Sequence, residues 1–321
     1  MKKWYIFAVV ILMMALVAVG CSQPAPAPEP ETPGQVDPEP EPEEPALDPD
    51  EVLMEAAEAF FAGVAASNNM TDSKEVKDML DANPNSVFIL DIRSAEDFEA
   101  GHIPGSVHST RGKVGEIMDR IPRNRPVIVA CYTGQNAAYT VAYLRMAGFD
   151  NATTLFYGIN LGWIEREGFD LEGTGMNAAA DLPAVTSPAN EKEEIIWARA
   201  KEYSQAVDAG QVGFIPLDQQ QAFYEELQGN PNAYYVLDIR RAEDFAAGHI
   251  EHSSHIAWGQ FGTLLEDLPR TVPVVIGCYS GQTSAQTLGV LRMLGFDSAR
   301  SILYGVRDGW VQRNNLPVVT Q

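Results

Sequence analysis

The stretch "PVIVACYTGQNAAYTVAYLRMAGF", residues 126–149, carries the change of pattern that decides the fold. It opens on a short apolar run without polar alternation, which predicts a strand buried on both faces. Cys131 ends that run, a glycine follows three residues later, and a helical pattern continues to Gly148. A buried strand that turns through a glycine loop into a helix predicts a parallel α/β sheet.

A near copy of this stretch, "PVVIGCYSGQTSAQTLGVLRMLGF", occupies residues 273–296 and places Cys278 at the position of Cys131. Cys278 lies 147 residues after Cys131, and the same offset of 147 residues pairs Asp91 with Asp238. The match between the two segments runs without gaps over more than a hundred residues. That length is too great for a small solenoid repeat. The chain therefore contains a duplicated domain.

Each copy is expected to fold as a small parallel sheet flanked by helices. The first repeat is assigned to residues 51–168, an interdomain linker to 169–190, and the second repeat to 191–321. The linker is rich in Gly, Ala and Pro, which favours an irregular connection.

The N-terminal residues 1–21 are typical of an export signal. Lys2 and Lys3 precede seventeen apolar residues, and "AVGC" then ends at Cys21. This pattern resembles a bacterial lipoprotein signal, in which Cys21 is the lipidation site and anchors the mature chain to a membrane outside the cytoplasm. An uncleaved membrane anchor is the alternative, since seventeen residues are just long enough to span a bilayer.

Residues 22–50 are expected to form a disordered stalk. They hold nine acidic side chains and no Lys or Arg, and proline recurs throughout. This segment contributes much of the formal net charge of −22. Such a charge argues against nucleic acid as a partner, because phosphates are bound by Lys and Arg.

Cys131 and Cys278 lie where parallel strands end, which is where sites form in open α/β sheets. A loop that curls into a helix N-terminus directs backbone N–H groups and positive partial charge at the thiol. We therefore expect each thiol to have a lowered pKa and to react as a nucleophilic thiolate. The loop residues assigned to substrate binding are Tyr132, Thr133, Gly134, Gln135, Asn136, Ala137, Tyr279, Ser280, Gly281, Gln282, Thr283 and Ser284.

Residues 90–108, "LDIRSAEDFEAGHIPGSVH", followed by the Cys loop and Gly-Phe, resemble a rhodanese domain, and so do residues 237–255 with theirs. The resemblance implies sulfur transfer without a metal or organic cofactor. In it the Cys thiolate accepts sulfane sulfur from a small donor such as thiosulfate, and the persulfide passes it to a thiol or cyanide. Neither loop carries the Arg or Lys found in many rhodaneses, which leaves the donor open.

Four charged residues at the strand ends, Asp91, Arg93, Asp238 and Arg240, are expected to support the site rather than react. Arg111 and Trp258 occupy equivalent positions and are placed at the two pocket rims, where they favour different donors or acceptors.

Two further functions remain open: a module that carries or senses persulfide without fast turnover, and an envelope redox protein that switches a Cys131–Cys278 disulfide. A zinc site is not expected, because neither Cys has a second Cys or His at ligand spacing.

Overall fold

The computed structural model describes residues 46–320 except 65, 172, 209 and 211–212. The described part from Ala46 onward forms one compact unit. The predicted signal at 1–21, with Cys21, and the stalk residues 22–45 lie outside it. Within the described residues, no helix combines the length and the apolar character needed to cross a membrane.

The first repeat contains a parallel sheet in the order β1-β5-β4-β2-β3. Its strands are Met70–Thr71 (β1), Phe88–Asp91 (β2), Val107–His108 (β3), Val127–Ala130 (β4) and Ala152–Leu155 (β5). β2 and β4 are buried along their whole length, as their apolar runs predict. The register places Asp91 beside Ala130, so the carboxyl ends of these two strands meet at one edge.

The second repeat builds the same sheet in the order β6-β10-β9-β7-β8, again with parallel pairings. Its strands are Phe214–Ile215 (β6), Tyr235–Asp238 (β7), Ser254–His255 (β8), Val274–Gly277 (β9) and Arg300–Ile302 (β10). The register of Asp238 beside Gly277 repeats that of Asp91 beside Ala130. The predicted fold of two tandem parallel α/β domains is confirmed.

Helices cover both sheets, and those that follow the second and fourth strands of each repeat begin at equivalent residues. The first repeat contains α1 (Pro49–Gly63), α2 (Ser73–Ala82), α3 (Ala95–Ala100) and α4 (Gln135–Met146). The second contains α5 (Glu191–Asp208), α6 (Leu217–Gly229), α7 (Ala242–Ala247) and α8 (Gln282–Met293). Shorter 3₁₀ segments cover Arg111–Glu116, Met118–Arg120, Ala179–Asp181 and Trp258–Leu264, and π-helical segments cover Gly158–Arg166 and Gly305–Val311.

The helix that leads each repeat packs against the other repeat. α1 contacts the 3₁₀ segment Trp258–Leu264, where the Phe61 and Phe261 rings lie 5.0 Å apart. α5 contacts the first repeat, where Ser204 Oγ accepts a hydrogen bond from the Gly115 N–H. The two repeats therefore share one apolar core that includes residues of both.

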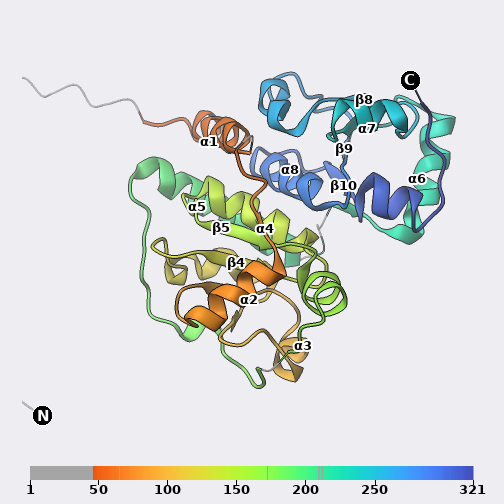
Figure 1. Cartoon of the computed structure of the whole chain (residues 1–321). Coiled ribbons are helices and arrows are strands. Elements are labelled where there is room, and N and C mark those ends of the chain that lie inside the picture. The colour runs from red at the N-terminus through yellow and green to blue at the C-terminus, as the bar shows by residue number, and fades with distance from the viewer. Residues whose placement is uncertain (1–45, 65, 172, 209, 211–212, 321) are drawn as a thin grey trace, which may run out of the picture. The chain divides into compact units, whose positions relative to one another are not determined.

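α4 and α8 pack closely against each other at the centre of this shared core (Figure 1). A Cβ atom on Gly289 of α8 would lie 2.7 Å from the Tyr139 carbonyl oxygen of α4. Glycine at this position is what permits the backbones to approach so closely. Because each of these helices begins within a Cys loop, their contact brings both loops to one interface.

The structure revises two boundaries. α1 begins at Pro49, so the last two residues assigned to the stalk are helical; Asp48 caps the helix by accepting the Asp50 N–H at 2.9 Å. In the predicted linker, Gly173 forms a β-bridge with His102 and Ala178 forms one with His108, so this part of the linker is attached to the first repeat.

Candidate functional site

Each Cys loop, residues 131–137 or 278–284, holds its sulfur in a cradle of backbone N–H groups. Cys131 Sγ accepts hydrogen bonds from Gly134 N at 3.2 Å and Ala137 N at 3.3 Å. Cys278 Sγ accepts them from Gly281 N at 3.2 Å and Ser284 N at 3.4 Å. Both cysteines are free thiols and almost fully buried. The predicted cradle is thus present in both repeats.

Glycine lies at the turn of each loop because the backbone there is left-handed. Gly134 has φ +88° and Gly281 has φ +84°, a region that side chains disfavour. A second pair of glycines, Gly158 and Gly305, packs directly against the backbone of the loops. Sequence reasoning did not assign them to the site. A Cβ on Gly158 or Gly305 would lie 2.5 Å from the carbonyl oxygen of Cys131 or Cys278. The repeated Tyr-Gly after the last strand was the available signal.

The expected lowering of the pKa is wrong for Cys131. Burial raises the pKa of this thiol, and the surrounding N–H groups, led by that of Ala137, oppose the rise without cancelling it. A buried thiolate loses its hydration, which backbone dipoles replace only in part. The cradle therefore moderates the loss of hydration at Cys131 rather than making the thiol acidic.

The tyrosine after each Cys is anchored to the N-terminus of a short helix. The Tyr132 hydroxyl donates to the Asp97 carboxylate and accepts from Ser94 N at 3.1 Å. The Tyr279 hydroxyl donates to Asp244 at 2.5 Å and accepts from the Arg241 N–H at 3.1 Å. Asp97 and Asp244 lie in the repeated Ala-Glu-Asp-Phe motif but were not predicted as site residues.

These bonds also act on the two carboxylates. Hydrogen bonds from Ser94 and then Tyr132 hold the pKa of Asp97 below its ordinary value, and the bond from Tyr279 lowers the pKa of Asp244. A carboxylate that accepts hydrogen bonds is stabilised in its charged form. Each tyrosine therefore ties its Cys loop to the start of a neighbouring short helix.

The charged residues at the strand ends bond to each other and to a nearby turn. Arg93 Nη2 donates to Asp91 Oδ2 at 2.7 Å and to the Gly101 carbonyl at 2.8 Å. Asp238 and Arg240 repeat the pair, and Arg240 Nη2 reaches the Gly248 carbonyl at 2.6 Å. Both pairs are buried. This geometry matches a role in positioning the strand ends.

The rims of the two Cys loops differ in their charged and aromatic side chains. Arg111 Nη1 donates to Asn136 Oδ1 of the first loop at 2.6 Å. Trp258 Nε1 donates instead to Thr287 Oγ1 at 3.1 Å, one helical turn beyond Thr283. These contacts place Arg111 at the first loop and Trp258 against α8.

The second loop has a cation that sequence reasoning missed. The Arg307 guanidinium lies 5.6 Å from the centre of the Tyr279 ring and pairs with Asp308. Asn160 stands at the equivalent position of the first repeat. The offset between the repeats was enough to find this difference, but the contact with Tyr279 depends on the fold.

The glutamine that begins α4 or α8 reaches across the interface to the other Cys loop. Gln282 Oε1 accepts the Tyr157 N–H at 3.2 Å and would lie 2.5 Å from a Cβ on Gly134. Gln135 Nε2 would lie 2.0 Å from a Cβ on Gly281. Both side chains are buried. The two loops are thus in contact through exchanged side chains.

The remaining polar loop residues make local bonds. Thr133 Oγ1 donates to Gln135 Oε1 at 3.3 Å, and Ser280 Oγ accepts from Gln282 Nε2 at 3.3 Å. Within the described residues, no group of three or more His, Cys, Asp or Glu side chains is arranged to hold a metal ion.

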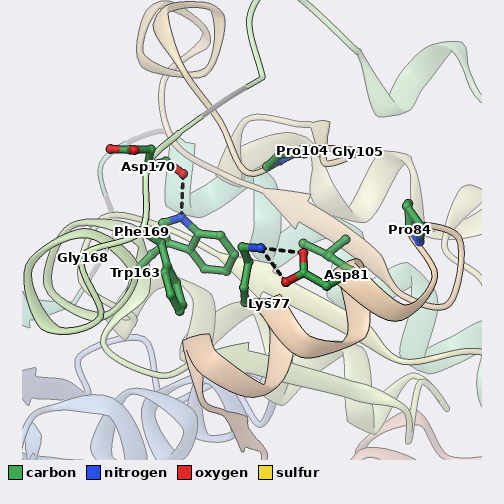
Figure 2. Close-up of a pocket in the computed structure, with 10 residues that line it drawn as sticks. Lys77, Asp81, Pro84, Pro104, Gly105, Trp163, Gly168, Phe169 and Asp170 are labelled. Carbon is green, nitrogen blue, oxygen red and sulfur yellow. Dashed lines mark hydrogen bonds and ion pairs between the residues drawn. The ribbon is translucent and has the colours of Figure 1, made fainter.

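A separate pocket of about 430 Å³ lies in the first repeat (Figure 2). Trp163 and Phe169 line it together with Lys77 of α2. Tyr224 replaces Lys77 in the second repeat, and its ring lies 5.7 Å from that of Trp310. No residue of the Cys loops lines this pocket.

Comparison with known proteins identifies the family. The rhodanese-like domain family matches residues 72–164 and 219–313. The chain belongs to the rhodanese family and contains its domain twice. It is a transferase of the rhodanese type.

Curated relatives of this rhodanese include two proteins named thiosulfate sulfurtransferase GlpE. The one from Actinobacillus succinogenes is 36% identical over 84 residues, which cover 26% of this chain and 74% of the relative. The one from Pseudomonas savastanoi is 30% identical over 73 residues, which cover 23% of this chain and 69% of the relative.

Among solved structures, a thiosulfate sulfurtransferase from Pseudomonas aeruginosa matches with a TM-score of 0.35 and 22% identity, covering 77% of this chain and 45% of that one. The 3-mercaptopyruvate sulfotransferase SseA from Escherichia coli matches with a TM-score of 0.33 and 18% identity, covering 73% and 97%. The assignment of the family rests on the sequence matches.

Proposed function

We propose that this rhodanese moves sulfane sulfur from a donor such as thiosulfate to a thiol or cyanide acceptor through a persulfide on both Cys131 and Cys278. The observation that carries the proposal is the duplicated cradle, in which each buried sulfur accepts two backbone N–H bonds. The names of the curated relatives support thiosulfate as the donor class.

The reaction needs no external oxidant. The Cys thiolate attacks the sulfane sulfur of thiosulfate, a new S–S bond forms, and sulfite leaves with the electron pair of the broken S–S bond. An acceptor thiolate or cyanide then attacks the outer sulfur of the persulfide, and the Cys leaves as a thiolate. The N–H groups of the cradle stabilise the anionic sulfur at both stages.

A comparison of single-Cys variants tests the proposal. In a Cys21→Ser background, the chain, Cys131→Ser, Cys278→Ser and the double variant are exposed to thiosulfate, and persulfide is measured by intact mass. We expect sulfur on both sites, on one site in each single variant, and on none in the double variant. No sulfur on the unaltered sites would reject the proposal, and sulfur on one site only would reject its two-site form.

The same samples separate the other two functions. Sulfur uptake without release of thiocyanate after cyanide is added would indicate a persulfide carrier or sensor. A loss of two hydrogen masses on mild oxidation, with no sulfur uptake, would indicate a redox protein with a Cys131–Cys278 disulfide.

We further propose that the chain is exported and held on a membrane by a lipid on Cys21. The support is the charged, apolar and small-residue pattern of residues 1–21. Fractionation of cells tests it: the chain is expected with the membranes, and Cys21→Ala is expected to prevent lipid attachment. Recovery of both forms without lipid would contradict the proposal.

A further inference from the structure

The two cradles differ in one hydroxyl group. In the second repeat, Ser284 Oγ lies 3.3 Å from Cys278 Sγ, in addition to the bond from the Ser284 N–H. Ser301 Oγ of β10 donates to Ser284 Oγ at 2.9 Å. Because Ser301 occupies a lone pair of Ser284, the Ser284 proton is free to point at the sulfur. All three side chains are buried.

The first repeat lacks this hydroxyl but retains the residue that would orient it. Ala137 stands at the position of Ser284, and Thr154 of β5 stands at the position of Ser301. Thr154 is fully buried, and within the described part of the chain its Oγ1 has no hydrogen-bond partner. A buried hydroxyl without a partner is unfavourable. The partner that Thr154 lacks corresponds to the hydroxyl that Ser284 provides and Ala137 does not.

A thiolate can only accept hydrogen bonds, so Ser284 must donate once Cys278 is ionised. Hydrogen bonds to a charged group are stronger than those between neutral groups, and most so where water is excluded. Among the described residues, the hydrogen-bond donors to Cys131 Sγ are backbone N–H groups, and burial raises the pKa of this thiol. The two cysteines therefore face different energetic conditions for becoming nucleophiles.

We propose that Ser284, oriented by Ser301, is a positioning residue that stabilises the thiolate of Cys278, and that Cys278 is consequently the first of the two sites to take up sulfur at neutral pH. The order of uptake rests on the proposed sulfur transfer, whereas the difference in thiolate stability does not.

The ultraviolet absorbance of the thiolate tests the difference directly. The full chain with Cys21→Ser and one remaining site cysteine is titrated, and the spectrum of the Cys-free chain is subtracted to remove tyrosine. We expect thiolate to appear about one pH unit lower for Cys278 than for Cys131, the size that one charge-assisted hydrogen bond implies. Equal midpoints, or the reverse order, would overturn the proposal.

Substitution of the hydroxyl should move the midpoint in opposite directions in the two repeats. Ser284→Ala is expected to raise the Cys278 midpoint by about one unit, and Ala137→Ser to lower the Cys131 midpoint by about one unit. The gain in the first repeat guards against a simple loss of folding, which cannot produce it. Absence of both shifts would overturn the role of Ser284.

Thr154→Val provides a matched control because it removes the orphan hydroxyl while keeping the shape of the side chain. On its own it should leave the Cys131 midpoint unchanged, but in the Ala137→Ser chain it should remove part of the gain. An equal gain with and without Thr154 would contradict the orienting role of the β5 and β10 hydroxyls.

A brief exposure of the chain to thiosulfate then tests the order of uptake. At neutral pH we expect persulfide to form on Cys278 about threefold faster than on Cys131, because the larger thiolate fraction is offset in part by the lower nucleophilicity of a less basic thiolate. Different midpoints without any sulfur uptake would refute the sulfur transfer and leave the role of Ser284 intact. Uptake at equal rates would refute only the order.

Discussion

The two repeats have the same backbone around the sulfur but different side chains at its rim. Both loops use a left-handed glycine, two N–H donors and a supporting glycine after the last strand. Around this shared frame, the first repeat has Ala137 where the second has Ser284, and Asn160 where the second has Arg307. The backbone therefore forms the anion cradle in both repeats, whereas the side chains around it distinguish the two sites.

The largest effect is expected where the shared frame is broken in one repeat only. In Gly158→Ala, a Cβ 2.5 Å from the Cys131 carbonyl oxygen and a φ of +66° require the loop to shift. A displacement of about 1 Å lowers a rate by about 100-fold, so sulfur uptake by Cys131 should fall by that factor while Cys278 keeps its rate. Site-resolved mass measurement checks this.

Gly305→Ala should produce the opposite pattern, with Cys278 impaired and Cys131 retained. Gly229→Ala is the control, because nothing lies within 4 Å of a Cβ at that position. Equal loss at both sites from either substitution would show that the two loops cannot be disturbed separately.

The exchange of leading helices predicts a large effect on stability. Phe61 of α1 is buried against Phe261 of the second repeat, so Phe61→Ala should lower the free energy of unfolding by about 3–5 kcal/mol. Denaturant unfolding followed by fluorescence and circular dichroism measures this loss. Met176→Ala, at an exposed position, should change it by less than about 0.5 kcal/mol. A loss of similar size in both variants would contradict the packing of α1 on the second repeat.

A smaller effect is expected from the cation at the second rim. In the Cys131→Ser chain, Arg307→Ala should raise the KM for thiosulfate about threefold, because an exposed charge contributes roughly 0.5–1 kcal/mol. Asn160→Arg in the Cys278→Ser chain should lower KM by a similar factor. Steady-state kinetics at two salt concentrations checks both, since salt screens such attraction. A KM that ignores both substitutions would mean that the donor does not pass this rim.

The smallest effect concerns the tyrosines that are common to both loops. The pKa values of Asp97 and Asp244 are lowered in the folded chain, so their contribution to stability is full at neutral pH. It is lost as the pH falls below the ordinary Asp value of about 3.9 and through the lowered one. Tyr279→Phe should raise the pKa of Asp244 and weaken this acid dependence. NMR titration of the Asp244 carboxyl measures the shift, with Asp97 as the internal reference.

Features encoded by local runs of residues were predictable from the sequence. The buried strands β2 and β4 and the glycine turn at Gly134 follow from short apolar runs and a single residue type. The two-residue strands β1 and β3 carry too little pattern to be detected, and they exist because longer strands offer them a partner. The burial that raises the pKa of Cys131 also depends on the whole fold.

Contacts between the repeats could not be predicted from the sequence, because they pair residues that lie far apart in the chain. The hydrogen bond between Ser284 and Ser301 lies within the second repeat, and it could be inferred from the sequence only after β10 and the Cys loop were known to meet. The crossing of Gln135 and Gln282 likewise depends on the packing of α4 on α8.

The exchanged leading helices have a consequence for synthesis of the chain. When the ribosome has finished the first repeat, α5 does not yet exist to cover it, and α1 has no second repeat to cover. Closing these contacts joins α1 to a segment about 200 residues later and α5 to a segment about 90 residues earlier, and such long separations in sequence slow the final step of folding. A protein cut at residue 190 would leave each half with the helix of the other.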